Sequence, residues 1–415
     1  MKRELIINRR HAAFSEHVSG SITVLFAGDN VKRSADSTYP FTVNRNFYYL
    51  TQCDEDGLIY VQLRNAVGHK EILFIKDHNP VMEKWVGKSL SKDDAIHKSG
   101  VFMIQPLSQF EAFFARTLSR NDIQTLYIDS ERDQLTHRIS EAENFVQRIR
   151  RLYPGLHIVN INQRLNKMRT IKADAEVEMI KEAIDITRVG IESLVSKLKP
   201  GKLEYQAVAD FKYELNLRHC DVSFDTIAAS GKDATVLHYV SNHKEMQDGD
   251  LLLLDCGATF KHYCGDISRT FPVNGKFSTR QREAYEIVLE AQSEVIKAIK
   301  PGVTLIQLNE IVRNVYKDRC VETKMIEAPE QVDDIYYHSV SHSLGLDTHD
   351  VGMFEGTLLE PGMVITVEPG LYLEHESIGI RIEDDVLVTE TGCVNLSSSI
   401  LKTVEEIESF MNLSK

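Results

Sequence analysis

The chain has 415 residues, of which 42% are hydrophobic and 26% are charged, and its formal net charge is -13 at pH 7. The length is enough for about two or three domains, and the composition is that of an ordinary globular protein. Proteins that bind nucleic acid usually carry a basic surface, so the negative charge argues against a nucleic-acid partner.

The sequence lacks the patterns of a membrane or secreted protein. Its longest apolar runs, such as residues 251–254, are far shorter than the roughly 20 residues that a membrane-spanning helix needs. The apolar stretch at residues 5–7 is too short for the core of a signal peptide. The six cysteines form no CxxC pair, and free thiols are usual in a reducing compartment. We therefore expect a cytoplasmic protein without a membrane partner.

The first part of the chain mixes short strands with helices. Strand patterns occur at residues 59–63, 71–75 and 126–128. Residues 141–151 have the pattern of an amphipathic helix. No segment here contains a recognisable cluster of catalytic or metal-binding residues. The pattern of the sequence changes near residue 171. We expect a smaller mixed α/β domain over residues 1–165 and a second domain over residues 166–415.

The second part contains an internal repeat of about a hundred residues. Helix patterns cover residues 175–198, 203–218, 278–299 and a segment that begins at residue 304. Within each pair the two helices are separated by Lys-Pro-Gly, at residues 199–201 and 300–302. Both helices of the second pair open with the sequence of a capping box. The repeat therefore indicates two related halves.

Each pair of helices leads to two strands that each carry an acidic residue. The first strand of each half, residues 249–257 and 362–370, begins with Gly and carries Asp255 or Glu368 six residues later. The following strands carry Asp266 and Glu383. We therefore predict an α+β fold in which two α-α-β-β halves are related by a pseudo-twofold axis.

These four acids predict a metal site. A carboxylate in an apolar strand is costly to bury unless it is paired or binds a metal ion, and four together would repel one another. Two divalent cations would neutralise them. His342 is the candidate for a further ligand, because it belongs to a segment with three histidines, at 338, 342 and 349. This oxygen-rich set with one imidazole suits Mn(II), Co(II), Fe(II) or Zn(II).

Four segments together resemble the metal-site blocks of one superfamily, which includes aminopeptidase P, prolidase and methionine aminopeptidase. They read LLLLDCGATFKHYCGDISRTFPV, HSVSHSLGLDTHDVG, PGMVITVEPGLY and GIRIEDDVLVT. The resemblance implies the pita-bread fold for the second domain. It also implies that five residues are the metal ligands, namely Asp255, Asp266, His342, Glu368 and Glu383. Asp266 and Glu383 would bridge the two ions, and Mn(II) is the metal that the resemblance favours.

The first domain narrows the set of families that the chain resembles. Residues 33–51, RSADSTYPFTVNRNFYYLT, resemble the corresponding part of bacterial aminopeptidase P, whereas methionine aminopeptidases would leave about 165 residues without a counterpart. The implied activity is hydrolysis of the Xaa-Pro bond at the N-terminus of peptides by a hydroxide that bridges the ions. A prolidase restricted to Xaa-Pro dipeptides is the nearest alternative. The second alternative is a non-catalytic binding protein with the same fold. That alternative predicts that residues of the metal-ligand set have been lost.

The resemblance also implies roles for residues around the ions. Glu368 would relay a proton from the nucleophile to the proline nitrogen. His238 and His349 match histidines that contact the substrate, and His338 matches a third catalytic histidine. Arg381 is predicted on the same face of its strand as Glu383, where it could hold a metal-bound carboxylate.

Two aromatic residues are further candidates for substrate binding. Tyr372 follows the strand that carries Glu368. Trp85, the only tryptophan, lies in a segment that resembles the one through which a neighbouring subunit completes the active site in this superfamily. A homodimer or homotetramer is therefore expected, in which the first domain serves assembly.

Overall fold

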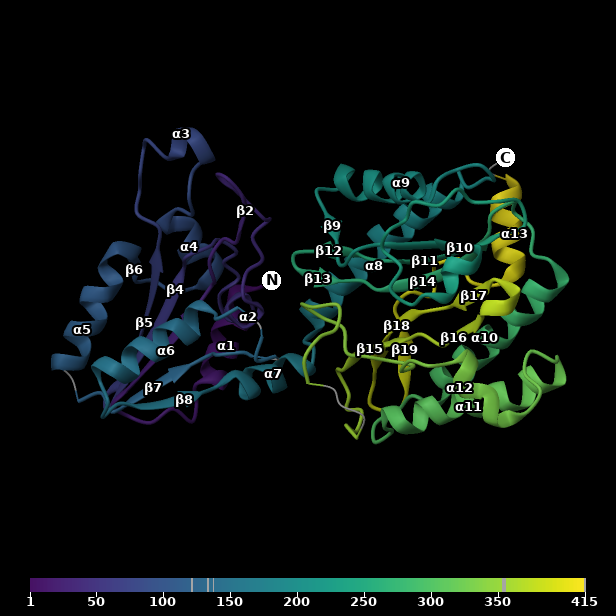
Figure 1. Ribbon diagram of the computed structural model, residues 1–415. Coiled ribbons are helices and arrows are strands. Elements are labelled where there is room, and N and C mark those ends of the chain that lie inside the picture. The colour runs from purple at the N-terminus through teal and green to yellow at the C-terminus, as the bar shows by residue number, and fades with distance from the viewer. Residues whose placement is uncertain (121, 133, 137, 353–355, 414–415) are drawn as a thin grey trace. The chain divides into compact units, whose positions relative to one another are not determined.

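The structure is a computed structural model that consists of two compact units, Met1–Arg169 and Thr170–Lys415 (Figure 1). It describes the whole chain except residues 121, 133, 137, 353–355 and 414–415. None of the helices in the described ranges is both long and apolar enough to cross a lipid bilayer.

A six-stranded sheet forms the centre of the first unit. Its strands follow the order β6-β5-β4-β1-β7-β8. Their bounds are β1 Ser21–Phe26, β4 Ile59–Asn65, β5 Gly68–Ile75, β6 Ile104–Pro106, β7 Thr125–Ile128 and β8 His157–Asn160. β4 pairs antiparallel with both β5 and β1, whereas β1 pairs parallel with β7. The strands predicted at residues 59–63, 71–75 and 126–128 are confirmed as parts of β4, β5 and β7.

Helices and a small hairpin complete the first unit. The helices are α1 Arg3–Ala13, α2 Arg45–Thr51, α3 Glu83–Val86, α4 Lys92–Ser99, α5 Phe110–Arg120, α6 Glu141–Leu152 and α7 Asn162–Thr170, and the hairpin is β2 Lys32–Ser34 with β3 Ser37–Thr38. Phe114 of α5 and Phe145 of α6 pack against Val24 and Val61 of the sheet. The predicted helix at residues 141–151 is confirmed as α6, and the capping box that Ser140 forms with its third helical residue explains where it begins.

Four long helices of the second unit occur in two pairs, as predicted. They are α8 Asp174–Val195, α9 Glu204–Leu217, α10 Thr279–Ala298 and α11 Leu305–Glu322, and shorter helices follow at α12 Val332–Ile335 and α13 Val404–Leu413. The caps of α10 and α11 are the predicted capping boxes at Ser278 and Thr304. A Cβ on Gly190 of α8 would lie only 2.5 Å from the Phe211 ring of α9, so the first pair packs closely.

The strands of the second unit have the same arrangement in each of its two halves. In the first half, β11 Leu251–Cys256 pairs antiparallel with β14 Ile267–Pro272, and β12 Ala258–Phe260 with β13 Tyr263–Cys264 is inserted between them. In the second half, β15 Val364–Val367 pairs with β18 Asp384–Val388 around β16 Gly370–Leu373 and β17 Ile378–Arg381. The remaining strands are β9 Asp221–Val222, β10 Ile227–Ser230 and β19 Cys393–Asn395. Helix pairs α8–α9 and α10–α11 flank these strands in Figure 1, so the α+β fold of two α-α-β-β halves is confirmed.

The prediction that each acid lies inside a strand is correct only for Asp255. Asp266 directly precedes β14, Glu368 directly follows β15, and Glu383 directly precedes β18. At these positions an inserted hairpin begins or ends, and this interrupts the strand ladder. The backbone amides bond elsewhere, for example from Glu383 to the carbonyl oxygen of Ser268 at 3.0 Å and from Glu368 to that of Val340 at 2.8 Å.

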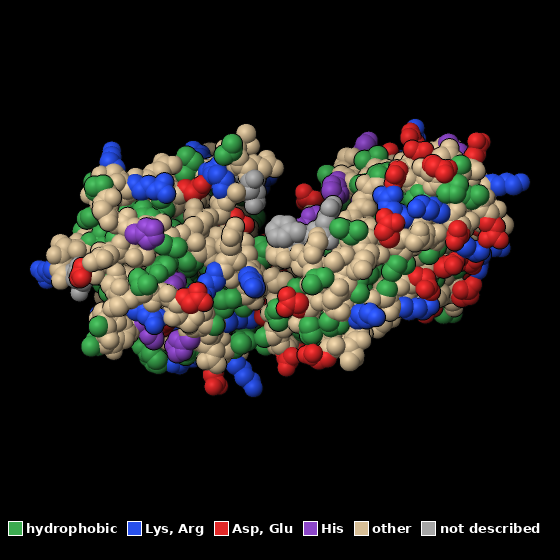
Figure 2. Space-filling model, turned by 90° about the horizontal axis from the view of Figure 1, so that it is seen from below, with side chains coloured by type: hydrophobic (Ala, Val, Ile, Leu, Met, Phe, Trp, Pro, Cys, Tyr) green, Lys and Arg blue, Asp and Glu red, His purple; other side chains and the backbone are tan. Residues whose placement is uncertain are grey.

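Charged side chains on the surface do not locate a functional site. Figure 2 shows Asp and Glu interspersed with Lys and Arg over the surface of the second unit. Many form exposed ion pairs, such as Arg282 with Glu405 at 2.7 Å. Exposed pairs of this kind contribute about 0–1 kcal/mol each to stability. The acids that need an explanation are those buried in the interior.

Candidate metal centre

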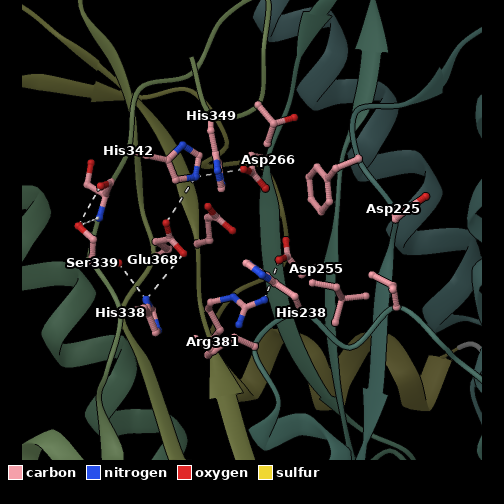
Figure 3. Close-up of a pocket in the computed structure, with 17 residues that line it drawn as sticks. Asp225, His238, Asp255, Asp266, His338, Ser339, His342, His349, Glu368 and Arg381 are labelled. Atoms are coloured by element: carbon pink, nitrogen blue, oxygen red, sulfur yellow. Dashed lines mark hydrogen bonds and ion pairs between the residues drawn. The ribbon is translucent and has the colours of Figure 1, made fainter. Parts of the chain in front are cut away.

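A cavity of about 530 Å³ in the second unit contains side chains from both of its halves (Figure 3). All five residues predicted as metal ligands line it, together with the three candidate histidines and Arg381. The full lining comprises Phe224, Asp225, Ile227, Leu237, His238, Val240, Asp255, Asp266, His338, Ser339, Ser341, His342, Thr348, His349, Glu368, Arg381 and Glu383. The fold therefore brings residues together that are far apart in the sequence.

Three of the predicted ligands lie close enough to hold one cation. Oxygen or nitrogen atoms of Asp266, His342 and Glu383 all lie within 4.8 Å of one another. His342 Nε2 is 3.4 Å from Asp266 Oδ2 and 3.4 Å from Glu368 Oε1. The imidazole nitrogen thus faces two carboxylates, which is the arrangement expected around a divalent cation.

The other nitrogen of His342 determines its tautomer. Nδ1 lies 3.1 Å from the carbonyl oxygen of Ser343, which can only accept a hydrogen bond, so Nδ1 carries the proton. Nε2 therefore faces Asp266 and Glu368, where it carries a proton in the metal-free protein and could offer its lone pair to a cation that displaces this proton. Histidines that bind metals are usually oriented by a hydrogen bond of this kind from the second nitrogen.

Asp255 supplies an unsatisfied oxygen at the same centre. Its Oδ2 accepts a hydrogen bond from Nη2 of Arg381 at 2.7 Å. Its Oδ1 is buried and has no hydrogen-bond partner among the described residues. A buried carboxylate oxygen without a partner is costly, and a cation would satisfy it. The donor set therefore fits a divalent metal.

Burial and mutual repulsion perturb the pKa values of these groups. Burial, together with repulsion from nearby carboxylates and against the opposing effect of His342, raises the pKa of Asp266 to about 6 and the pKa of Glu368 to about 7. Burial and the same neighbours hold the pKa of Glu383 well above its ordinary value. Burial lowers the pKa of His342, but Asp266 and Glu368 outweigh it and raise that pKa to about 9. Without a cation the site retains protons, and these are the positive charges that a metal ion would replace.

Three neighbouring residues that the sequence analysis missed orient the ligands. Ser268 Oγ donates to Glu383 Oε2 at 2.8 Å and accepts from Arg381 Nε at 2.8 Å. Thr366 Oγ1 accepts from the His342 amide at 3.1 Å. Asp385 Oδ2 accepts from the Asp266 amide at 3.1 Å. Ser268 and Thr366 lie two residues from a predicted ligand, so the alternation of side chains along a strand could have identified them.

The candidate histidines lie on the walls of the cavity. His338 Nδ1 lies 2.9 Å from the Ser339 carbonyl oxygen and Nε2 lies 2.9 Å from the Tyr372 hydroxyl. Burial, with the charge of Arg381, lowers the pKa of His338 to about 4. His349 packs edge-on against His342 with ring centroids 4.2 Å apart, and burial lowers its pKa. His338 and His349 are therefore neutral near pH 7.

Tyr372 and Trp85 do not line this cavity. Tyr372 is 2% exposed, and its hydroxyl accepts a hydrogen bond from Arg381 Nη1 at 3.1 Å, so it lies behind Arg381 and His338. Trp85 belongs to α3 of the first unit and is 81% exposed. The structure therefore places Tyr372 in support of the site, and a role for Trp85 stays a prediction.

An apolar wall faces the acids and was also missed in the sequence. It consists of Phe224, Ile227, Leu237 and Val240. These residues line the same cavity as the labelled acidic and histidine side chains of Figure 3. Cavities that bind small molecules commonly combine an apolar lining with a few convergent polar groups. The site is thus shaped to hold an organic ligand beside a cation.

Two families of known proteins match the chain. Residues 178–390 match metallopeptidase family M24. Residues 6–127 match the aminopeptidase P N-terminal domain. The first match includes every residue of the predicted ligand set.

Individual relatives match over nearly the whole length. The Xaa-Pro aminopeptidase of Escherichia coli strain K12 is 33% identical over 439 aligned positions, which cover 99% of this chain and 98% of the relative. The structure of aminopeptidase P from E. coli with the inhibitor Pro-Leu matches with a TM-score of 0.92 and 33% identity, over 100% of this chain and 99% of the other. A solved structure from Bacillus anthracis matches with a TM-score of 0.97 and 43% identity over the same shares.

Proposed function

The chain belongs to metallopeptidase family M24, and from that premise we propose that it is a metal-dependent aminopeptidase that hydrolyses the Xaa-Pro bond at the N-terminus of peptides. The observation that carries this proposal is the buried cluster of Asp266, His342 and Glu383, beside the unpartnered oxygen of Asp255. The alternative of a non-catalytic binding protein predicts lost ligands, whereas all five predicted ligand residues line the cavity.

The ligand set supports two divalent ions. Four buried carboxylates surround the centre, and Arg381 alone cannot balance them. We infer that Asp255, Asp266, His342, Glu368 and Glu383 would hold the ions, and that Asp266 and Glu383 would be shared between them. Mn(II) suits a site of four carboxylates and one imidazole, with Co(II), Zn(II) and Fe(II) as alternatives.

The bound metal would supply a hydroxide nucleophile near neutral pH and would polarise the scissile carbonyl group. Glu368 takes a proton from the attacking water and delivers it to the proline nitrogen, which accepts it as the C–N bond breaks. The products are the free first residue and a peptide that begins with proline.

The histidines on the cavity wall would hold the substrate. His349 carries an N–H that can stabilise negative charge on the carbonyl oxygen, and His238 lies on the same cavity. Arg381 fixes Asp255 and, through Ser268, Glu383. His338, which is oriented by its hydrogen bond with Tyr372, would contact the substrate from a different part of the cavity wall. The apolar wall would receive the side chain of the first residue or the proline ring.

The first unit is proposed to serve assembly into a homodimer or homotetramer. On α3 and just before it, the apolar residues Val81, Met82, Trp85 and Val86 are exposed. These would be available to contact a neighbouring subunit, where Trp85 could border the substrate. The six free cysteines are consistent with our proposal of a cytoplasmic enzyme.

The test compares two substrates on protein that has been stripped with a chelator and reloaded with Mn(II). One substrate is an Xaa-Pro dipeptide and the other a longer Xaa-Pro-Yaa-Zaa peptide, and release of the first residue is followed. We expect cleavage of the longer peptide and none before reloading. Cleavage of the dipeptide alone would make the enzyme a prolidase, and cleavage of neither with any of the four metals would refute the proposal.

A further inference from the structure

A buried ion pair lies directly behind the loop that carries two of the site histidines. Lys172 Nζ is 3.2 Å from Asp350 Oδ2, and each side chain is only 1% exposed. Lys172 Nζ also donates to Ser343 Oγ at 3.4 Å. Neither residue of the pair lines the cavity. Burying two charges is costly, so a pair at this place calls for an explanation.

The two ends of the loop from His342 to Asp350 are joined through hydrogen bonds to the carbonyl group of Ser343. The Asp350 amide donates to the Ser343 carbonyl oxygen at 2.8 Å, and His342 Nδ1 donates to the same oxygen at 3.1 Å. One carbonyl group therefore fixes both the end of the loop and the tautomer of His342. His349, one residue before Asp350, is held in contact with the His342 ring (Figure 3).

The backbone around the pair leaves little room for adjustment. A Cβ on Gly345 would lie 2.1 Å from Asp350 Oδ2 and 3.0 Å from Lys172 Cε, so the loop passes tightly over both charged groups. The Lys172 amide donates to the Gly362 carbonyl oxygen at 2.8 Å, which fixes the lysine relative to the segment before β15. The pair thus connects the loop to the turn that precedes β15 in the second half.

We propose that Lys172 and Asp350 are positioning residues, which hold the Ser343 carbonyl group and thereby keep His342 Nε2 and His349 directed into the metal centre. The proposal rests on the roles of His342 and His349 in the proposed function. Lys172 draws Asp350 and Ser343 together from behind the loop. Their hydrogen bonds then set the direction in which the two imidazoles project.

The test uses the double variant Lys172→Met/Asp350→Asn. Each single substitution leaves one buried charge without its partner and can prevent folding, whereas the double variant removes both charges and nearly keeps the volumes. Binding of Co(II) to the metal-free protein is measured by calorimetry, with circular dichroism as the check on folding. We expect the affinity to fall by about 10–100-fold, as is typical when groups that orient ligands are lost.

A kinetic measurement separates positioning from simple structural support. At saturating Co(II), we expect kcat for an Xaa-Pro peptide to fall while KM changes little, because the ligands are present but the histidines are misdirected. The matched control is Lys202→Met/Asp210→Asn, an ion pair of the same chemistry in this unit that lies outside the cavity. That variant should bind Co(II) as the unmodified protein does.

A folded Lys172→Met/Asp350→Asn variant that binds Co(II) with unchanged affinity would overturn the proposal. Because this readout is metal binding, its failure is distinguishable from failure of the proposed function. If the unmodified protein binds Co(II) but cleaves no Xaa-Pro bond, the aminopeptidase assignment fails while the positioning role can still be measured.

Discussion

Arg381 makes three contacts that no shorter or more flexible cation could make at once. Its Nη2, Nε and Nη1 atoms donate to Asp255, Ser268 and Tyr372, at 2.7, 2.8 and 3.1 Å. The planar guanidinium group is suited to such simultaneous contacts, whereas an ammonium group is a single point charge. The residue therefore connects Asp255, a predicted ligand, to Ser268 and to Tyr372, which lies behind the cavity.

The variant Arg381→Lys should retain the charge but lose this geometry. We expect kcat/KM for an Xaa-Pro peptide to fall about 10–100-fold, in line with other groups that orient metal ligands. Arg280→Lys is the control, because Arg280 forms ion pairs with Glu283 and Glu376 outside the cavity. Equal activity of the two variants would show that only the charge of Arg381 matters.

At the residue scale, the sequence identified the acids and histidines that line the cavity better than the residues that support them. Buried acids at matching positions of a repeat are visible in a sequence because they contradict the apolar pattern around them. Ser268 and Thr366 do not contradict it, since hydroxyl residues are common in strands. Asp385 could have been read as exposed, and only the structure shows that it accepts the Asp266 amide.

At the scale of helices and strands, local sequence signals predicted the helices reliably, whereas the pairing of strands that are far apart in the sequence was not predicted. The capping boxes at Ser278 and Thr304 determine where α10 and α11 begin, and these signals are local in sequence. The hairpins β12–β13 and β16–β17, inserted between paired strands, were not predicted. Nor was the strand order of the first unit, because pairing such as β1 with β7 joins segments about a hundred residues apart.

The close approach of α8 and α9 gives a prediction about stability. Gly190→Ala should improve the helix propensity of α8 by about 1 kcal/mol. However, its methyl group would lie 2.5 Å from the Phe211 ring and 3.2 Å from Leu215, and overpacking of this kind costs about 1–3 kcal/mol. We therefore expect a net decrease in the free energy of unfolding, measured by urea denaturation.

Gly155→Ala provides the control for this substitution. No atom lies within 4 Å of a Cβ at Gly155, and its backbone does not require glycine. That variant should be as stable as the unmodified protein. A Gly190→Ala variant that is more stable than both would mean that α8 and α9 can separate without cost.

At the scale of the whole molecule, the metal centre makes stability depend on pH. Glu368 has a pKa of about 7 in the folded protein without metal, above its ordinary 4.5, and His342 has a pKa of about 9, above its ordinary 6.5. Both groups bind their protons more tightly when the chain is folded. The stability that they contribute is therefore present at low pH and is lost as the pH rises toward the folded values.

We expect the metal-free protein to lose roughly 5 °C in Tm between pH 6.5 and 8.5. His338 and His17, whose pKa values are lowered to about 4, oppose this trend only below pH 6.5. Reloading with Mn(II) should raise Tm most at the higher pH, because the ions replace the missing protons. Thermal unfolding with and without chelator measures both slopes, and equal slopes would contradict the prediction.

The metal centre also constrains the order of events during synthesis. Arg381 and Asp255, which hold each other at its edge, are 126 residues apart in the chain. Contacts of such high sequence separation form slowly, and domains fold as the ribosome delivers them, N-terminal part first. If Glu383 is one of the metal ligands, the nascent chain would have to extend past this residue before the site is complete. Metal binding would then follow the pairing of the two halves and stabilise a fold that has already formed.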